Sequence, residues 1–200
     1  MLLAPRGRAR GTALLAVLLA CPGPGKPPPK QCAAAEPVGD AQKPIELLPF
    51  GFDEVGQRVL LINRSPLYLA IPGQGGYVLY AGVAARNLDG CNPRLQAQLV
   101  DKVSGKALTG FDERSLHLVA AEDGFWYPAK AALASRGEVA NIPACPDALH
   151  QGVAGRIATL HLEVEDTNGK KASLDLEVVP TCLREDQRCA CLCGPDPGGC

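Results

Sequence analysis

Cysteine is the residue with the widest chemistry in this chain, because its thiol can bind a metal, exchange with a disulfide or carry a lipid. The 200-residue sequence contains nine cysteines, and Cys21 stands apart from the rest, directly behind a short apolar run. The others are Cys32, Cys91, Cys145, Cys182, Cys189, Cys191, Cys193 and Cys200. An even set of cysteines in an exported chain is typical of a disulfide framework.

The sequence does not determine which cysteines pair in disulfides, but their positions restrict the possible pairings. The segment from Cys182 onward holds an odd number of cysteines, so at least one of them must pair outside that segment if all are oxidised. We expect a bond between Cys91 and Cys145 across the folded body, and a bond from Cys32 to the C-terminal segment. Closing the Cys91–Cys145 loop would stabilise the folded state by about 4 kcal/mol in the chain-entropy model.

A metal or redox site is the alternative use of the C-terminal thiols. The run Cys189-Ala-Cys191-Leu-Cys193 contains three potential thiolates, which bind zinc or copper(I) tightly. Structural zinc sites favour cysteine pairs separated by two residues, and this segment has neither that spacing nor a histidine. We therefore expect disulfides here, with no metal ligand and no cofactor.

The residues before Cys21 indicate where the chain resides. A basic segment precedes the apolar run, which is too short to span a bilayer and ends in Leu18-Leu19-Ala20-Cys21. These features are typical of a secretory signal, so we expect residues 1–20 to be a signal peptide.

The ending Leu18–Cys21 resembles the lipobox of bacterial lipoproteins. The resemblance implies that Cys21 is the first residue of the mature chain and carries acyl chains such as palmitate, which hold it at a membrane. Pro22 stands where the family has an aspartate in inner-membrane proteins, which favours the outer membrane. Residues 21–44, rich in proline and glycine, predict an extended tether. An ordinary secretory signal, with Cys21 there by chance, is the alternative.

Composition argues against several functions. The formal net charge is −1 and the charges are scattered, so no basic face suggests nucleic acid. The sequence lacks the zinc-peptidase, nucleophile-elbow and phosphate-loop motifs. We therefore assign no catalytic residue and expect a protein that is not an enzyme. The adjacent acids Asp112-Glu113 and Glu122-Asp123 keep a hydrolase as an alternative.

Strict alternation of apolar and polar residues is the clearest structural signal. Residues 160–165 and 172–178 alternate on either side of the turn Asp166-Thr-Asn-Gly169. Period-two alternation around an Asn-Gly turn predicts a β-hairpin with one buried face. Residues 45–75 predict shorter strands that pack on, or precede, the main domain.

Short alternating strands without alternating helices indicate an all-β fold, an antiparallel sandwich. Residues 76–180 have the length of one immunoglobulin-like domain, and their closing hairpin resembles the last two strands of bacterial Ig-like domains of envelope proteins. The resemblance implies an Ig-like β-sandwich. We expect the leader and tether before it to be disordered. Residues 181–200 form a cysteine-rich tail that has too few apolar residues for a core, so cross-links must hold it.

The run Phe125-Trp126-Tyr127 is the one cluster of large aromatic residues. Such a cluster at the end of a sandwich can form a contact surface for a partner. It can equally fill the core of an aromatic-poor chain. We name these three residues as a possible partner contact, with core packing as the alternative.

Together these features predict a lipoprotein of the cell envelope with a non-catalytic binding or structural role. Its expected partners are the membrane, through the lipid on Cys21, and a protein or polysaccharide. One alternative is an envelope hydrolase or carbohydrate-active enzyme with carboxylates on loops. The other is a metal- or thiol-active protein that uses the C-terminal cysteines.

Overall fold

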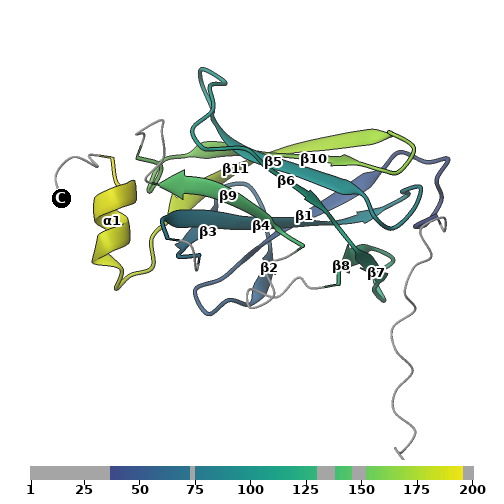
Figure 1. The fold of residues 1–200 in the computed structure, drawn as a ribbon, viewed down its shortest axis with the longest axis horizontal. Helices are drawn as coiled ribbons and strands as arrows, with labels where there is room; N and C mark the ends of the chain where they lie inside the picture. Colours follow the sequence, from purple (N-terminus) through teal and green to yellow (C-terminus); the bar gives the residue numbers. More distant parts are fainter. Residues whose placement is uncertain (1–36, 73–74, 130–137, 146–151, 196–200) are drawn as a thin grey trace, which may run out of the picture.

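The computed structural model describes residues 37–72, 75–129, 138–145 and 152–195. These residues form eleven strands and one short helix (Figure 1). In chain order they are β1 (Glu46–Phe52), β2 (Arg58–Leu60), β3 (Ser65–Ala70), β4 (Tyr77–Arg86), β5 (Arg94–Asp101), β6 (Asp112–Ser115), β7 (Leu118–Ala120), β8 (Trp126–Pro128), β9 (Ala140–Cys145), β10 (Ala158–Glu165), β11 (Lys171–Thr181) and α1 (Gln187–Cys193). The expected signal peptide, Cys21 and most of the tether lie outside the described residues. Within them, no helix is long and apolar enough to cross a membrane.

The β10–β11 hairpin confirms the strongest prediction from the sequence. Leu160 lies opposite Leu176 and Leu162 lies opposite Leu174, and burial alternates strictly along β10. On the other side of β10, β5 pairs in the same alternating phase, with Leu99 opposite Leu160. The apolar phase of these strands faces the main core.

The sheet is mixed, so the expectation of a purely antiparallel sandwich is wrong. Its main path runs β2-β1-β4-β3-β11-β10-β5-β6, and within this path β3 and β11 are parallel. The chain reverses direction between β2 and β3 at Arg64, which has a φ of +65°. The backbone N–H of Arg64 donates to the carbonyl of Glu177 in β11. This turn directs β3 along β11 in the same direction, a pairing that no local sequence pattern encodes.

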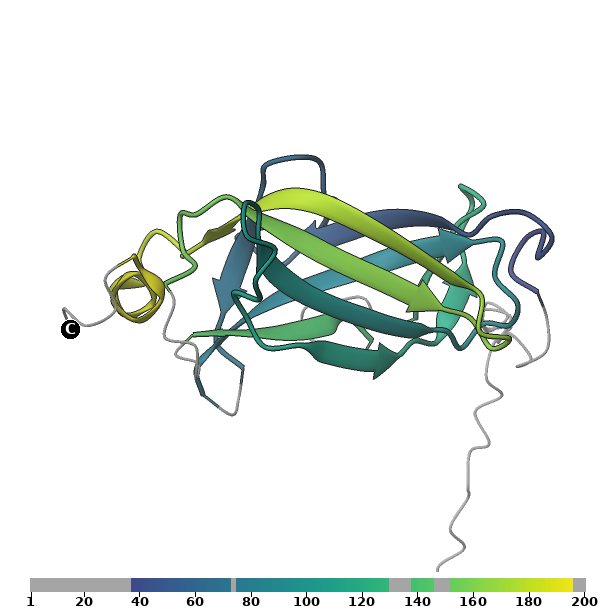
Figure 2. The same cartoon turned by 90° about the horizontal axis from the view of Figure 1, so that it is seen from above.

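Strand β4 organises the rest of the body. It pairs with β1, β3, β8 and β9, and every residue except Arg86 at its end is buried. One face of β4, with Leu79, Ala81 and Val83, belongs to the main core. The sheet curls around that core (Figure 2), and the N–H of Gly110 reaches the carbonyl of Pro143 in β9. Burial on both faces explains the nearly continuous apolar run of β4.

The second face of β4 is covered by a smaller aromatic cluster. Phe50 and Phe52 of β1 pack there with Val78, Tyr80 and Val139. Phe50 lies opposite Gly82 in the β1–β4 register, and a Cβ at position 82 would lie 2.3 Å from the Cζ atom of the Phe50 ring. Glycine is therefore required at position 82, because the ring occupies the space of a side chain.

We predict that Gly82→Ala lowers the free energy of unfolding by about 1–3 kcal/mol, since the new methyl overlaps a buried ring. In a Phe50→Leu background the same substitution should cost less. Denaturant unfolding of the wild type, both single variants and the double variant measures this coupling. An equal cost of Gly82→Ala in both backgrounds would contradict the contact.

Candidate functional site

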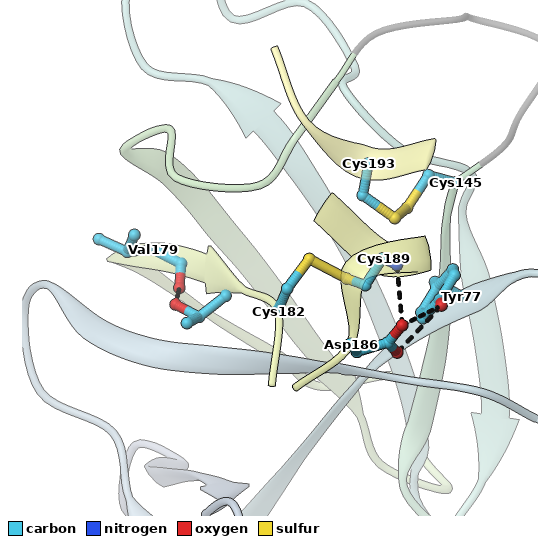
Figure 3. The surroundings of a disulfide bond; sticks show 8 residues. Tyr77, Cys145, Val179, Cys182, Asp186, Cys189 and Cys193 are labelled. Carbon is cyan, nitrogen blue, oxygen red and sulfur yellow. Dashed lines mark hydrogen bonds between the residues drawn. A yellow bond between two sulfur atoms is a disulfide. The ribbon is translucent and has the colours of Figure 1, made fainter. Parts of the chain in front are cut away.

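Disulfides hold helix α1 against one end of the body. Cys145, the last residue of β9, is bonded to Cys193, and Cys182 is bonded to Cys189 (Figure 3). Cys91 and Cys191 are disulfide-bonded as well. Three cysteines of the seven-residue α1 are thus in disulfides, and the expectation of a disulfide-linked tail is confirmed for the described residues.

The expected Cys91–Cys145 bond is wrong, because Cys145 pairs with Cys193. Cys145 lies opposite Tyr77, at the start of β4, whereas Cys91 follows the other end of β4 in the chain. A ten-residue strand spans roughly 30 Å, far beyond the reach of a disulfide. The other candidates, Cys32 and Cys200, lie outside the described residues, as does the expected bond from Cys32 to the tail.

A polar contact begins α1 and joins it to β4. The Asp186 carboxylate accepts a hydrogen bond from the N–H of Cys189 at 2.9 Å, which caps the helix. It also accepts the Tyr77 hydroxyl at 2.9 Å (Figure 3). Burial and this hydrogen bond raise the pKa of Tyr77. The helix itself buries only Cys189 and Cys193, and Leu192 packs partly buried against the main core, so its position depends largely on the covalent bonds and this cap.

The three aromatic residues predicted as a partner contact divide between two sides of the sheet. Trp126 lies opposite Ala85 and packs against the main core. Tyr127 packs against the second cluster, and the Phe125 ring lies under the Arg86 guanidinium at 4.8 Å. All three side chains are half-buried. Each therefore packs partly against the body, as the core alternative expects, and leaves part of its surface exposed, as the contact alternative expects.

Two arginines complete the surface around Phe125 and Tyr127. We call it the aromatic–arginine face and define it as Arg58, Arg86, Phe125 and Tyr127, with the buried Phe50 beneath it. Arg58 stacks on the Tyr127 ring at 4.1 Å and approaches the Phe50 ring at 5.6 Å. Arg86 also forms an ion pair with Glu46 of β1. Stacked guanidinium groups on aromatic rings add electrostatic attraction to packing. Sequence reasoning missed both arginines, because the pairing of β2 with β1, of β1 with β4 and of β4 with β8 brings them to these rings.

An Asp123–Tyr127 contact borders this face. The Tyr127 hydroxyl donates to Asp123 at 2.7 Å. This hydrogen bond is the largest cause of the lowered pKa of Asp123. Burial, followed by the same bond, raises the pKa of Tyr127. Asp123 is therefore held as a carboxylate, which does not suit a general acid.

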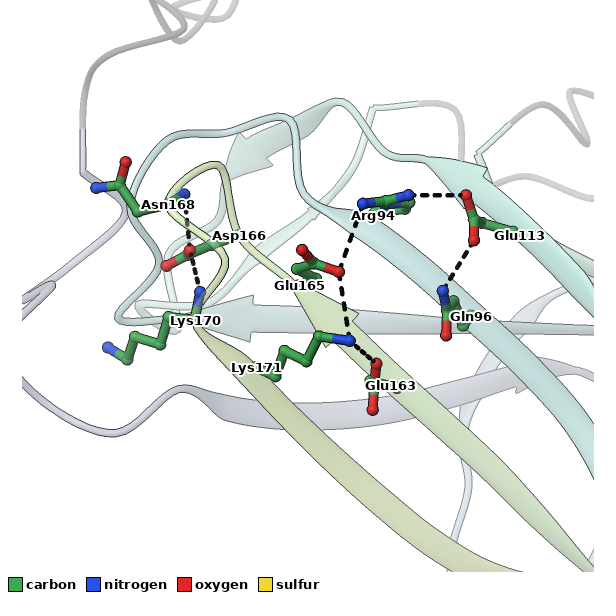
Figure 4. A network of polar contacts seen from close by, with 9 residues as sticks. All are labelled: Arg94, Gln96, Glu113, Glu163, Glu165, Asp166, Asn168, Lys170 and Lys171. Atoms are coloured by element: carbon green, nitrogen blue, oxygen red, sulfur yellow. Dashed lines mark hydrogen bonds and ion pairs between the residues drawn. The ribbon is translucent and has the colours of Figure 1, made fainter.

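The outer surface of β6, β5, β10 and β11 carries a network of opposite charges, which we call the polar face (Figure 4). Arg94 contacts Glu113 at 3.2 Å and Glu165 at 3.5 Å. Lys171 contacts Glu163 at 2.7 Å and Glu165 at 3.4 Å. These arginine, lysine and glutamate side chains pair with groups of opposite sign, which is the arrangement of a solvated sheet surface.

The β10–β11 turn ties the start of the described chain to the sheet. The buried Asp166 accepts the N–H groups of Asn168 and Lys170 (Figure 4). The Lys170 ammonium donates to the carbonyls of Ala41, Lys43 and Asn87. Lys170 thus helps to hold residues 41–43, together with the backbone hydrogen bonds between Val38 and Leu88, where the tether is predicted to join the body.

Three of the four acids considered for hydrolysis bind an arginine or a tyrosine hydroxyl. Asp112 binds Arg114 of its own strand at 2.7 Å. Glu113 binds Arg94 on the polar face, and Asp123 binds Tyr127. Every described carboxylate whose pKa is shifted is lowered, whereas a general acid needs a raised pKa. Among the described residues, no group of three or more His, Cys, Asp or Glu could hold a metal ion.

Comparison with known proteins gives no family for this chain: no family model, curated protein or solved structure matches it. Its function must therefore be inferred from its own residues.

We predict that the two disulfides differ in their contribution to stability. Cys145 and Cys193 are 48 residues apart, and Cys182 and Cys189 are 7 residues apart. In the chain-entropy model, replacing the first pair by alanine costs about 4 kcal/mol, and replacing the second costs about 2 kcal/mol. Denaturant unfolding of the two double variants, with the other bonds intact, measures the difference. A larger loss from the Cys182–Cys189 pair would contradict this order.

We also predict that the body loses stability in acid through the polar face. Arg94, followed by Gln96, lowers the pKa of Glu113, and Lys102, followed by Arg64, lowers that of Glu177. Each of these glutamates has a folded pKa below its unfolded pKa, which is about 4.3. It therefore stabilises the folded state at pH values above the unfolded pKa. This contribution is lost as the pH falls through the folded pKa.

Glu113→Gln and Glu177→Gln should therefore flatten the fall in unfolding free energy below pH of about 5. Unfolding titrations at a series of pH values test this effect. Variants that keep the full acid dependence of the wild type would overturn it.

Proposed function

We propose that this protein is a lipoprotein of the cell envelope, anchored outside the cytoplasm, with a non-catalytic binding or structural role. The observation that carries the proposal is the oxidised state of its cysteines: all six in the described residues are disulfide-bonded. Such bonds persist in oxidising compartments and are rare in the cytoplasm. A helix that buries only two cysteines needs these bonds to stay in place.

The proposed anchor is a lipid on Cys21, in the residues that resemble a lipobox. The described chain begins at the end of the body opposite α1 (Figure 1), and Lys170 fixes it there. A tether of residues 21–44 would thus attach the body by this end. The end of the body that carries α1 and its disulfides would then lie farther from the lipid than the end where the tether joins. This arrangement is in keeping with a body displayed on a membrane. The outer membrane is the proposed location.

For the binding role, the aromatic–arginine face is the best candidate surface. Tyrosine and arginine are enriched among the residues that dominate protein interfaces. Phe125, Arg86 and Tyr127 are partly exposed, and Arg58 is exposed. We retain the likeness to bacterial Ig-like domains as part of the proposal, because such domains occur in envelope proteins. That likeness concerns the fold, and a fold alone does not define a partner.

The alternatives have less support from the described residues. Glycoside hydrolysis by paired carboxylates uses one carboxylic acid that stays protonated near neutral pH, and the shifted carboxylates among the described residues have lowered pKa values. A thiol- or metal-active tail requires free thiolates, and Cys182, Cys189, Cys191 and Cys193 are in disulfides.

We predict that intact mass spectrometry of the protein from its native host finds a mature chain that begins at Cys21 and carries acyl chains. Cys21→Ser should abolish the lipid and release the protein from the membrane fraction. Cys32→Ser, which removes a thiol eleven residues further on, is the matched control and should keep both lipid and membrane association. A mature chain that begins at another residue would refute the anchor.

A further inference from the structure

Strand β2 forms an exposed edge of the sheet. It pairs with β1, with Leu60 opposite Phe50 and Arg58 opposite Phe52, and it is the first strand of the main path. Each of its three residues is exposed. The outer edge of such a strand presents backbone groups that can pair with another strand.

The register identifies which backbone groups point outward. The N–H of Leu61 donates to the carbonyl of Pro49, and the N–H of Asp53 donates to the carbonyl of Gln57. In an antiparallel pair, alternate residues hydrogen-bond to the partner strand, so Gln57, Val59 and Leu61 point toward β1. The N–H and C=O groups of Arg58 and Leu60 therefore point away from it. Within the described part of the chain, the backbone N–H and C=O groups of these two residues have no backbone hydrogen-bond partner.

This edge is also unusually apolar. Val59 is 38% exposed, Leu60 56% and Ile62 71%, and Val55 in the adjoining turn is 77% exposed. Proteins protect free edges with short strands, charged side chains, proline or a bulge. Of these, β2 has its three-residue length and Arg58, and it has no proline or bulge. A free apolar edge of this kind is complementary to another extended, apolar strand.

We propose that β2 pairs with β2 of a second copy of this chain, in an antiparallel arrangement with Val59 on the two-fold axis. In this register Arg58 lies opposite Leu60 of the other copy. Each of the two Arg58–Leu60 pairs then exchanges both backbone hydrogen bonds, because both residues present their backbone groups outward. Val59 meets its equivalent in the non-hydrogen-bonded position, where facing side chains lie closest.

Charge favours a second copy in this orientation. The turn before β2 carries Asp53 and Glu54, and the turn after it carries Arg64. Arg64 forms an ion pair with Glu177 at 3.3 Å, and its side chain stays 66% exposed. An antiparallel second copy brings the acidic turn of each chain to the basic turn of the other. A parallel copy would place like charges side by side, which is unfavourable. The same surface is used on both chains, so the contact closes as a dimer.

This inference goes beyond the proposed function and does not depend on the anchor. The test therefore uses the full chain with Cys21→Ser, in which a lipid at residue 21 cannot contribute to association. Sedimentation over a concentration series should detect a monomer–dimer equilibrium. A chain that stays monomeric throughout, or forms open higher assemblies, would overturn the proposal.

Leu60→Lys should weaken the dimer by about tenfold or more, because it places a lysine directly opposite Arg58 of the other copy. The matched control is Val103→Lys, at a site that is 94% exposed in the turn between β5 and β6, and it should leave the equilibrium unchanged. Equal effects of the two substitutions would contradict the location of the contact.

Charge reversal tests the orientation. Glu54→Arg and Arg64→Glu should each weaken the dimer roughly fivefold, and the double reversal should restore it. Amide hydrogen exchange of the unsubstituted edge is independent of any variant that folds poorly. The amides of Arg58 and Leu60 should become more protected as the concentration rises, and protection that does not change with concentration would refute the pairing.

Discussion

The disulfide between Cys145 and Cys193 is the constraint on which the disulfide-linked end depends. It joins the end of β9 to the last residue of α1, in a segment that has few apolar side chains to bury. The Asp186 cap and its contact with Tyr77 orient the helix, but a single cap contributes about 1 kcal/mol. Covalent bonds therefore supply what packing does not, and they require an oxidising environment. The proposed location of the protein follows from this requirement.

The remainder of the body depends on β4, which separates two apolar clusters. The main core lies on one face, and Phe50 covers Gly82 on the other. The second cluster also gives the protein its most distinctive surface, since Arg58 and Arg86 lie over rings at its border. The polar face is different in character, because its acidic and basic groups pair with one another. The surfaces that we propose for partners thus lie near β1, β2 and β8.

Local periodicity accounts for what could be predicted from the sequence. The alternation around Asp166–Gly169 predicted the β10–β11 hairpin correctly, and the even number of cysteines predicted disulfides. The parallel β3–β11 pair could not be predicted, since it depends on a turn at Arg64 that joins segments over a hundred residues apart. The pairing of Cys145 depended on where β9 meets β4. The division of Trp126 from Phe125 and Tyr127 depended on register, which composition does not reveal.

Peptide mapping of the protein from its host, with free thiols alkylated before digestion and without reduction, tests the central claim most directly. The account predicts cross-linked peptides that contain Cys145 with Cys193 and Cys182 with Cys189, and no alkylation at these four residues. Recovery of these cysteines as alkylated thiols in the folded protein would contradict it, because the tail would then be reduced and the inference of an oxidising compartment would fail.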